Sequence, residues 1–541
     1  MSRPVKRRHS MIDDEEVTCC LALLERSGVC EWLEDELRQR HRRPGRPRAL
    51  RVRALLCALL LLAVDDRALH LSGATEVLFC RLSDASKARL DVVGSAHDAR
   101  SFAARSRQVR YLFHALSSVL DPSGLVKNQR LRLDEFARRC VALGDDEARD
   151  ARVRLEFFMG QLLAASVARC ERPLHLAYGL DATPVPLFSR GPSKRSGLCA
   201  TDPDGGWYVR EGDHREREDH KGRRRNRIAW ALEATVLTSA SREPGRLSSF
   251  PNLVVGLALG RPGAEPGATA LRVLRGARAR GFAPGPLGVD RAYSGALAET
   301  FHLPVRALGY QLVVDYRVEQ LGCQANSHGA VLVEGTWYCP AMPEVLVAAT
   351  RDLRAGTITA DTYRARIAAR RAYALRRKSG PDADGYERFT CPALGSSPKV
   401  RCELRPASLL ALGARTVSPL LPAALLCSQS AITIAPDVAA RHAQSLAYGS
   451  EEWARNYATL RNTIEGWNGF VKDSAHEALA QPARRRVRGI AAQGVFITLL
   501  FVAANLRKIE AHQQQLANRD AIEERKRARR RRISLKDYLA S

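Results

Sequence analysis

Two aspartates in this chain occupy positions from which they could act together on one metal site. Asp181 ends the apolar run 176–180, which predicts a short buried strand, and an unpaired carboxylate is costly in such surroundings. Asp290 ends a second predicted strand, residues 285–290. Because the carboxyl ends of neighbouring strands in an α/β sheet meet at one edge, we expect the two aspartates to lie side by side. Divalent cations with oxygen ligands, normally Mg²⁺, would remove the repulsion between them.

Glu465 is the strongest candidate for a third carboxylate. Helical spacing in the segment YATLRNTIEGWNGFVK places four polar residues on one face: Arg461, Glu465, Asn468 and Lys472. On that face the glutamate could bind metal while Arg461 and Lys472 contact DNA phosphates. The alternative is an ordinary surface stripe with an Arg–Glu pair. The other candidates for the third acid are Asp315, Glu451, Glu452 and Asp473.

The elements that must position these acids follow a recognisable order. The hydrophobic pattern predicts strands at 174–183, 226–239 and 252–260, a helix at 267–281, a strand at 285–290, a helix at 294–309 and a strand at 310–318. This order predicts an α/β fold: a mixed sheet with helices on its faces, spanning residues 171–318. Residues 319–449, with a hairpin and a basic helix at 362–378, predict an inserted α+β subdomain. Helices return over 450–510 and include the Glu465 segment.

The N-terminal third is predicted to be a helical DNA-binding region, residues 1–170. Its apolar residues recur at helical spacing, and short polar segments separate the predicted helices. The arginine-rich stretch 38–53, which contains Arg46 and Arg48, precedes a helical run at 49–66. A basic arm and a helix in this order would suit phosphate contact and entry into a DNA groove. A solvated basic loop is the alternative.

The composition favours a polyanionic partner. The 541 residues contain 85 Lys and Arg against 58 Asp and Glu, a net charge of +27. The basic tail, residues 511–541 with the run RKRARRRR, predicts non-specific phosphate binding. The apolar stretches 54–64 and 495–504 are shorter than a membrane span and predict buried core helices. An N-terminus without an apolar signal region and thirteen scattered cysteines favour a reduced, cytoplasmic setting.

Four features together resemble the DDE transposases of bacterial insertion sequences. They are the strand order, the acids in GLDATPVP and GVDRAYSG, the long insert after the fifth strand, and the Glu465 helix. The resemblance covers roughly residues 174–475 and implies an RNase H-like catalytic domain with a β-rich insertion. It also matches Arg291 and Tyr293 after the second aspartate. Arg461, Glu465 and Lys472 keep the family's spacing, whereas Tyr457 stands one position too far from Arg461.

The resemblance implies an activity and a set of partners. Asp181, Asp290 and Glu465 would hold two Mg²⁺ ions, with Mn²⁺ able to substitute. Water would cleave a strand at each transposon end, and the released 3′-OH would attack target DNA. The predicted DNA contacts are Arg291, Tyr293, Arg461 and Lys472 from the resemblance, together with Arg46 and Arg48 of the basic N-terminal stretch. The partners would be the terminal inverted repeats, target DNA and a second copy of the chain in a synaptic complex, in a nucleoid-associated cytoplasmic setting.

Two alternative functions stay open on the sequence. One is a non-catalytic DNA-binding regulator derived from a transposase. The other is an RNase H-like nuclease without strand transfer, with Asp315 as its third ligand.

Several other signals have modest interpretations. The insert cysteines Cys323, Cys339, Cys391 and Cys402 lack the close pairs of most structural zinc sites, so separate buried thiols are favoured over zinc. The segment 209–227, with His214 and His220, predicts a solvated loop. Trp467 is expected in the core rather than stacked on a DNA base.

Overall fold

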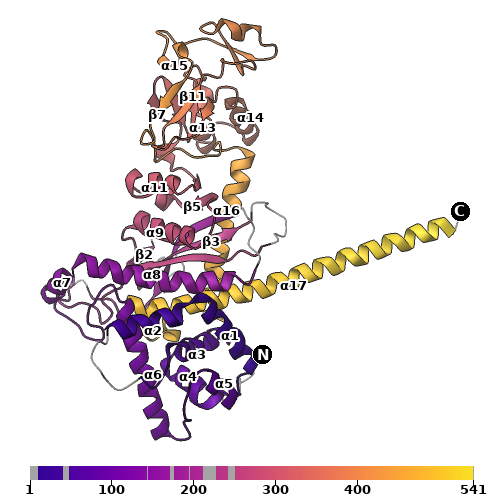
Figure 1. Ribbon diagram of the computed structural model, residues 1–541. Helices are drawn as coiled ribbons and strands as arrows, with labels where there is room; N and C mark the ends of the chain where they lie inside the picture. Colours follow the sequence, from indigo (N-terminus) through magenta and orange to yellow (C-terminus); the bar gives the residue numbers. More distant parts are fainter. Residues whose placement is uncertain are drawn as a thin grey trace, which may run out of the picture.

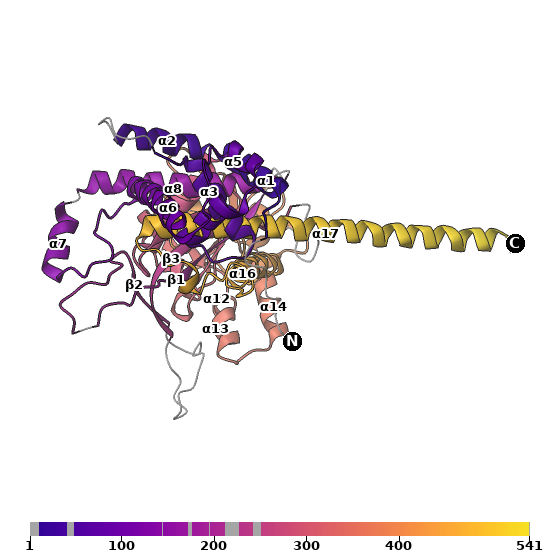
Figure 2. The ribbon, with the colours of Figure 1, turned by 90° about the horizontal axis from the view of Figure 1, so that it is seen from below.

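The structure is a computed structural model that describes residues 10–40, 48–142, 144–170, 176–193, 195–210, 227–241 and 250–539. In Figure 1 the N-terminal helices lie at the bottom, the central sheet in the middle and the insertion at the top. The last helix, α17 (Ile490–Leu539), begins among the N-terminal helices and projects far beyond the body, as Figures 1 and 2 both show. His214 and His220 fall outside the described residues.

The N-terminal region is helical, as predicted. Its α-helices are α1 (Asp14–Ser27), α2 (Val29–Arg40), α3 (Val52–Val64), α4 (Leu71–Glu76), α5 (Asp84–Arg89), α6 (Ala99–Leu120), α7 (Leu133–Ala142) and α8 (Asp145–Val167), and a π-helical turn spans Val77–Arg81. A capping box at Asp98 starts α6, and the left-handed Gly28 ends α1. Apart from Arg53 near its start, helix α3 is apolar, and its residues 54–63 are all buried. The prediction that this run enters a DNA groove is therefore wrong.

The centre of the molecule is a six-stranded mixed sheet, and the general α/β prediction is confirmed. Its order is β2-β3-β1-β5-β6, and β4 shares the outer edge of β3 with β2. Strands β5 and β6 run parallel to β1, while β3 pairs antiparallel with β1, β2 and β4. The strands are β1 (Ala177–Pro186), β2 (Gly206–Arg210), β3 (Arg227–Ala240), β4 (Val254–Gly260), β5 (Pro286–Val289) and β6 (Gln311–Val313).

The first strand ends three residues later than the sequence pattern predicted. Strand β1 includes Pro184 and ends at Pro186, although proline cannot donate a hydrogen bond to a neighbouring strand. The amide N–H of Leu187 donates to the carbonyl oxygen of Trp230 on β3. Backbone nitrogens of successive residues point to alternate edges of a strand, so the nitrogens of Pro184 and Pro186 face the opposite edge. That edge is open because β5 stops at Val289, and an open edge tolerates residues without an N–H. Asp181 therefore lies inside β1 and not at its end, which corrects the prediction.

Helices cover both faces of the sheet. Helix α9 (Pro266–Ala279) packs on β3 and β4, and α16 (Glu451–Phe470) packs across β1, β3, β5 and β6. Short helical turns connect the later strands: α10 (Arg291–Ser294), a π-helical turn at Ala298–His302 and α11 (Leu303–Ala307). The side chain of Ser450 caps the start of α16 by accepting from the N–H of Trp453.

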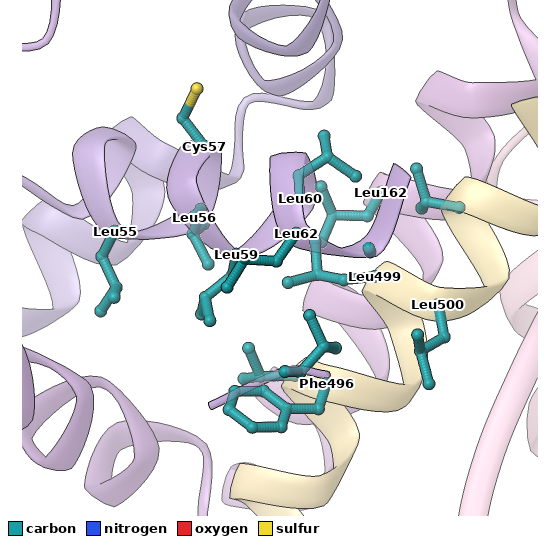
Figure 3. Packing of buried hydrophobic residues seen from close by; sticks show 14 of the residues in the cluster. Leu55, Leu56, Cys57, Leu59, Leu60, Leu62, Leu162, Phe496, Leu499 and Leu500 are labelled. Carbon is teal, nitrogen blue, oxygen red and sulfur yellow. The ribbon is translucent and has the colours of Figure 1, made fainter. Parts of the chain in front are cut away.

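The largest hydrophobic core joins the N-terminal helices to the sheet. Figure 3 shows Leu59 and Leu62 of α3 against Phe496 and Leu499 of α17, and Leu162 of α8 belongs to the same cluster. The N-terminal helices therefore share one hydrophobic core with the sheet and α17.

Helix α17 is one continuous helix through residue 510, where the predicted boundary of a basic tail lay. Within the described residues, its segment Ile490–Arg525 is the one helix long and apolar enough to cross a membrane. Of its most apolar window, 83% is buried inside the protein, as expected of a core helix.

The insertion has its own core and three small sheets. Its strands are β7 (Cys323–Ser327), β8 (Ala330–Val333), β9 (Thr336–Tyr338), β10 (Arg376–Ser379), β11 (Glu387–Thr390), β12 (Val400–Cys402), β13 (Arg415–Val417) and β14 (Ile432–Ile434). Its helices are α12 (Glu344–Val347), α13 (Ala349–Arg354), α14 (Ala360–Arg370) and α15 (Leu425–Ser428), with single 3₁₀ turns at Val318–Gln320 and Pro406–Leu410. The predicted helix over 362–378 ends at Arg370, and its last three residues belong to β10.

Candidate active site

The three predicted acids come together beneath α16. The parallel pairing of β1 with β5 ends at Leu180 opposite Val289, so the next residues, Asp181 and Asp290, lie side by side. Their side chains and that of Glu465 line one small pocket, whose other walls are Leu180, Gly288, Val289, Tyr457, Arg461 and Ile464. The juxtaposition predicted from the sequence is therefore present, although Asp181 reaches it from mid-strand.

Two glycines let α16 approach the sheet closely enough to form this pocket. A Cβ at Gly179 on β1 would lie 2.7 Å from the backbone oxygen of Leu460 and 3.0 Å from the Cβ of Ile464. A Cβ at Gly288 on β5 would lie 2.5 Å from the Cβ of Leu460. Only glycine fits at these positions without a shift of the helix, so both set the height of Arg461 above the acids.

Substitution of Gly179 by Ala is therefore expected to lift α16. A backbone oxygen cannot rotate away from the new methyl group, and we expect a loss of about 1–3 kcal/mol of unfolding free energy. A displacement near 1 Å would also lower any catalytic rate by about 10²-fold. Thermal unfolding and a cleavage assay would measure the two effects. Gly466→Ala on α16 is the stability control, because a Cβ there meets nothing within 4 Å and should stabilise the helix. Equal stability of wild type and Gly179→Ala would contradict the explanation.

Asp181 is the most strongly perturbed acid of the pocket. Its Oδ1 accepts from the N–H of Ala182 at 2.8 Å, and its Oδ2 accepts from Nδ2 of Asn468 at 3.0 Å. Burial, together with the nearby charges of Asp290 and Glu465, raises the pKa of Asp181 from its ordinary 3.8 to about 6, against the opposing N–H of Ala182 and charge of Arg461. Burial therefore disfavours the charged form of Asp181 in the metal-free protein.

Arg461 supplies the positive charge that the pocket has. Its Nη1 lies 2.8 Å from Oδ1 of Asp290, and its Nη2 lies 2.8 Å from Oε1 of Glu465. Asp290 also caps the short helix α10 by accepting from the N–H of Arg291 at 2.7 Å. The guanidinium was predicted to contact DNA phosphate. In the structure it instead bridges two of the three acids, where a metal cation would also be attracted.

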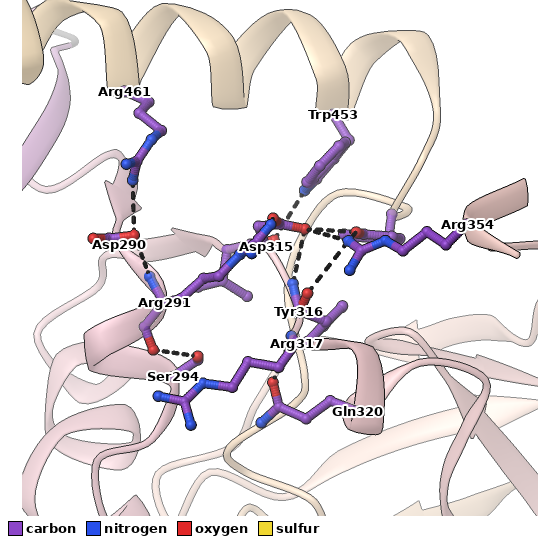
Figure 4. Close-up of polar contacts among 12 residues, drawn as sticks. Asp290, Arg291, Ser294, Asp315, Tyr316, Arg317, Gln320, Arg354, Trp453 and Arg461 are labelled. Atoms are coloured by element: carbon purple, nitrogen blue, oxygen red, sulfur yellow. Dashed lines mark hydrogen bonds and ion pairs between the residues drawn. The ribbon is translucent and has the colours of Figure 1, made fainter. Parts of the chain in front are cut away.

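Asp315, the alternative third acid, is committed elsewhere. Figure 4 shows it between Arg291 and Arg354, away from Asp290 and Arg461. It also accepts from the hydroxyl of Tyr448 at 2.6 Å, and it is 8% exposed. These contacts join the segment after β6 to α13 of the insertion, so Asp315 acts as a structural anchor. Arg291, predicted to contact DNA, is half-exposed and belongs to this anchor. Its hydrogen bond with Asp315 raises the pKa of Arg291.

The remaining residues predicted to contact DNA are Tyr293, Lys472, Arg48 and Arg46, and their surroundings in the structure differ. Tyr293 is 1% exposed and packs on Phe301, so its side chain cannot reach DNA from this position, and that prediction is corrected. Lys472 lies beyond the end of α16 at Phe470, so it does not continue the helical face as predicted. Arg48 is largely buried and pairs with Glu34 at 2.6 Å. Arg46 lies outside the described residues.

Two residues that contact the acids or line the pocket received no role from the sequence. Asn468 holds Asp181, and its position three residues after Glu465 was the signal available for it. Tyr457 forms a wall of the pocket and stacks on Trp453, with ring centroids 5.1 Å apart. Trp467 is 2% exposed and donates to the carbonyl of Asn252 at 2.8 Å, which confirms its predicted place in the core.

Comparison of the chain with protein-family models, curated proteins and solved structures gives no significant match. Among the described residues, no three Asp, Glu, His or Cys side chains are already gathered as a metal-binding group.

Proposed function

We propose that this protein is a DNA transposase that cleaves DNA strands at transposon ends and transfers the resulting 3′-OH into target DNA. The observation that carries the proposal is the convergence of Asp181, Asp290 and Glu465 from β1, the end of β5 and α16 onto one pocket. Three carboxylates from separate elements beside a polar, solvent-facing rim are typical of metal-dependent phosphoryl transfer.

The topology supports an RNase H-like core. Without β2, the order β4-β3-β1-β5-β6, with β3 antiparallel and β5 and β6 parallel to β1, agrees with that fold. The insertion lies between β6 and α16, where the resemblance to DDE transposases places it. This agreement is one of architecture, and the function is argued from the acids.

The residues present suit divalent cations with oxygen ligands. The pocket offers three carboxylates, and burial disfavours the charged form of Asp181 in the metal-free protein. Asp181, Asp290 and Glu465 would hold Mg²⁺, with Mn²⁺ as a substitute. The ions would supply Lewis-acid activation of the attacking and leaving oxygens. Asn468 would keep Asp181 oriented, and Arg461 would turn from the acids toward a DNA phosphate.

The surface supports double-stranded DNA as the partner. The net charge is +27 over the whole chain. Helix α6 presents the exposed side chains of Arg100, Arg107, Arg110 and Tyr111 on its outer face, a better candidate for backbone contact than the buried α3. A second copy of the chain, needed for a synaptic complex, and a cytoplasmic, nucleoid-associated setting are parts of the same proposal.

The decisive experiment is strand cleavage of labelled DNA that carries the sequences flanking the gene, with Mg²⁺ or Mn²⁺ and a target plasmid. Nicks at the element end followed by covalent joining to the plasmid are expected. Cleavage without joining would favour the nuclease alternative, and tight end binding without cleavage would favour the regulator. The engagement of Asp315 by two arginines already weakens the nuclease form that uses it as a ligand.

Arg461→Ala is expected to strengthen Mn²⁺ binding to the DNA-free protein. The guanidinium competes with a metal ion for Asp290 and Glu465, and two half-exposed ion pairs are worth about 1 kcal/mol together, or about fivefold in affinity. Titration calorimetry with Mn²⁺ would measure the change. Arg455→Ala, an exposed arginine on the same helix, is the control and should leave the affinity unchanged. Weaker Mn²⁺ binding in Arg461→Ala would contradict the competition.

A further inference from the structure

Four cysteines from distant parts of the insertion surround one small cavity. Cys339 follows β9, Cys391 follows β11, Cys402 ends β12, and Cys427 lies in α15. The cavity has a volume of about 10 Å³, room for one water-sized or ion-sized occupant. Its remaining walls are apolar side chains, apart from Arg405.

These cysteines are reduced and well shielded from water. None of the thirteen cysteines, all within the described ranges, forms a disulfide. Cys339, Cys391 and Cys402 are 5%, 4% and 7% exposed, and Cys427 is partly buried. A single buried cysteine is usually a small apolar core residue. Four that approach one another from four segments require a further explanation.

Two of the four occupy matching turns. Cys339-Pro340-Ala341 and Cys391-Pro392-Ala393 repeat one sequence. Each closes with a backbone bond from the residue three positions on: Met342 to the carbonyl of Cys339 at 3.0 Å, and Leu394 to that of Cys391 at 3.1 Å. In each turn the alanine N–H is directed at the cysteine sulfur, which opposes the rise in the pKa of the thiol caused by burial.

We propose that Cys339, Cys391, Cys402 and Cys427 bind one Zn²⁺ ion that cross-links the insertion. Four thiolates form the commonest kind of closed, structural zinc site, and soft sulfur ligands select zinc over Mg²⁺. In the described chain the sulfurs share the cavity without forming a closed cage. Binding would draw them to about 2.3 Å from the ion and release the thiol protons to solvent.

The proposed ligands differ by one residue from the four cysteines that the sequence analysis considered for zinc and interpreted as separate buried thiols. Cys323 is exposed, and it does not line the cavity, whereas Cys427 does. The spacings lack close pairs because the four ligands come from the ends of separate elements, which only the folded insertion brings together. The site is independent of the acids under α16 and does not depend on the proposed function.

The test is the metal content of the full-length protein, purified under reducing conditions without chelator and measured by plasma mass spectrometry. About one zinc per chain is expected. Cys391→Ser and Cys427→Ser should each lower it to below about a tenth of that value, while Cys323→Ser and Asp181→Asn should retain it. Cobalt in place of zinc should give the intense visible bands of a tetrahedral thiolate site.

A second measurement covers variants that fail to fold. Titration of the wild-type protein with an organomercurial should release zinc in step with the modification of four thiols. Three results would each overturn the proposal. The folded wild-type protein could lack zinc and take up none when Zn²⁺ is added. Alternatively, Cys427→Ser could retain zinc, or two of the four cysteines could form a disulfide.

Discussion

Asp181→Asn is expected to abolish metal-dependent DNA cleavage and at the same time to stabilise the metal-free protein. The variant keeps the size of the side chain and an oxygen that can accept from the N–H of Ala182, and the amide of Asn468 must turn so that its oxygen accepts from the new NH₂ group. It removes a charge that would bind metal, and we expect cleavage to fall by at least about 10³-fold. DNA binding, measured by fluorescence anisotropy, should stay within about twofold of wild type.

The stability half of this prediction follows from the pKa of Asp181. Unfolded, the carboxyl titrates near 3.8, whereas in the folded protein it keeps its proton until about pH 6. Between these values the folded state binds more protons, so stability falls as pH rises, and the full penalty applies above pH 6. Asparagine carries no charge at any of these pH values, so the variant does not lose this stability. We expect a gain of about 1–3 kcal/mol at pH 7 that vanishes below pH 3.8.

Thermal unfolding at pH 7 and pH 4, with chelator present, would measure the gain. A structural aspartate would behave in the opposite way, because its loss destabilises the fold. Glu465→Gln should likewise lose cleavage, and Glu452→Gln, an exposed glutamate at the start of the same helix, is its matched control. Wild-type cleavage by either active-site variant would remove that acid from the mechanism.

Glu334→Ala is expected to unfold the insertion locally. Glu334 and Arg370 are 1% and 2% exposed, and Oε2 of Glu334 lies 2.6 Å from Nη1 of Arg370. The glutamate also accepts from the hydroxyl of Thr350 at 2.8 Å and from the N–H of Gly322 at 3.2 Å. Removal of the carboxylate leaves a buried guanidinium without its counter-charge, at a cost of about 3–5 kcal/mol.

Hydrogen exchange read by mass spectrometry over β8, β9 and α14 would measure the local opening free energy. Glu344→Ala is the matched control, because its side chain is 77% exposed and its 3.3 Å pair with Arg351 is worth less than about 1 kcal/mol. The local opening free energy of Glu334→Gln should lie between those of Glu334→Ala and Glu344→Ala. If protection in Glu334→Ala equalled that of wild type, the pair would not hold the insertion together.

The sequence by itself determined the order of the elements and the identity of the acids. The sequence predicted the strands before Asp181 and Asp290 and the helix that contains Glu465. These elements could be predicted because buried positions recur with the period of the strand or helix. The division into a helical region, a mixed sheet and an insertion followed from changes in that period. The general α/β class is confirmed, whereas the RNase H-like assignment, the activity and the metal remain proposals.

The tertiary structure decided the details that depend on contacts between distant segments. The open edge of β1 beside Pro184 exists because β5 ends at Val289, and no local pattern encodes a neighbour's length. The bridge of Arg461 between Asp290 and Glu465 depends on how closely α16 packs over Gly179. Side-chain partners are set by spatial proximity, so a charged residue suited to DNA contact can equally end in an ion pair or a buried core.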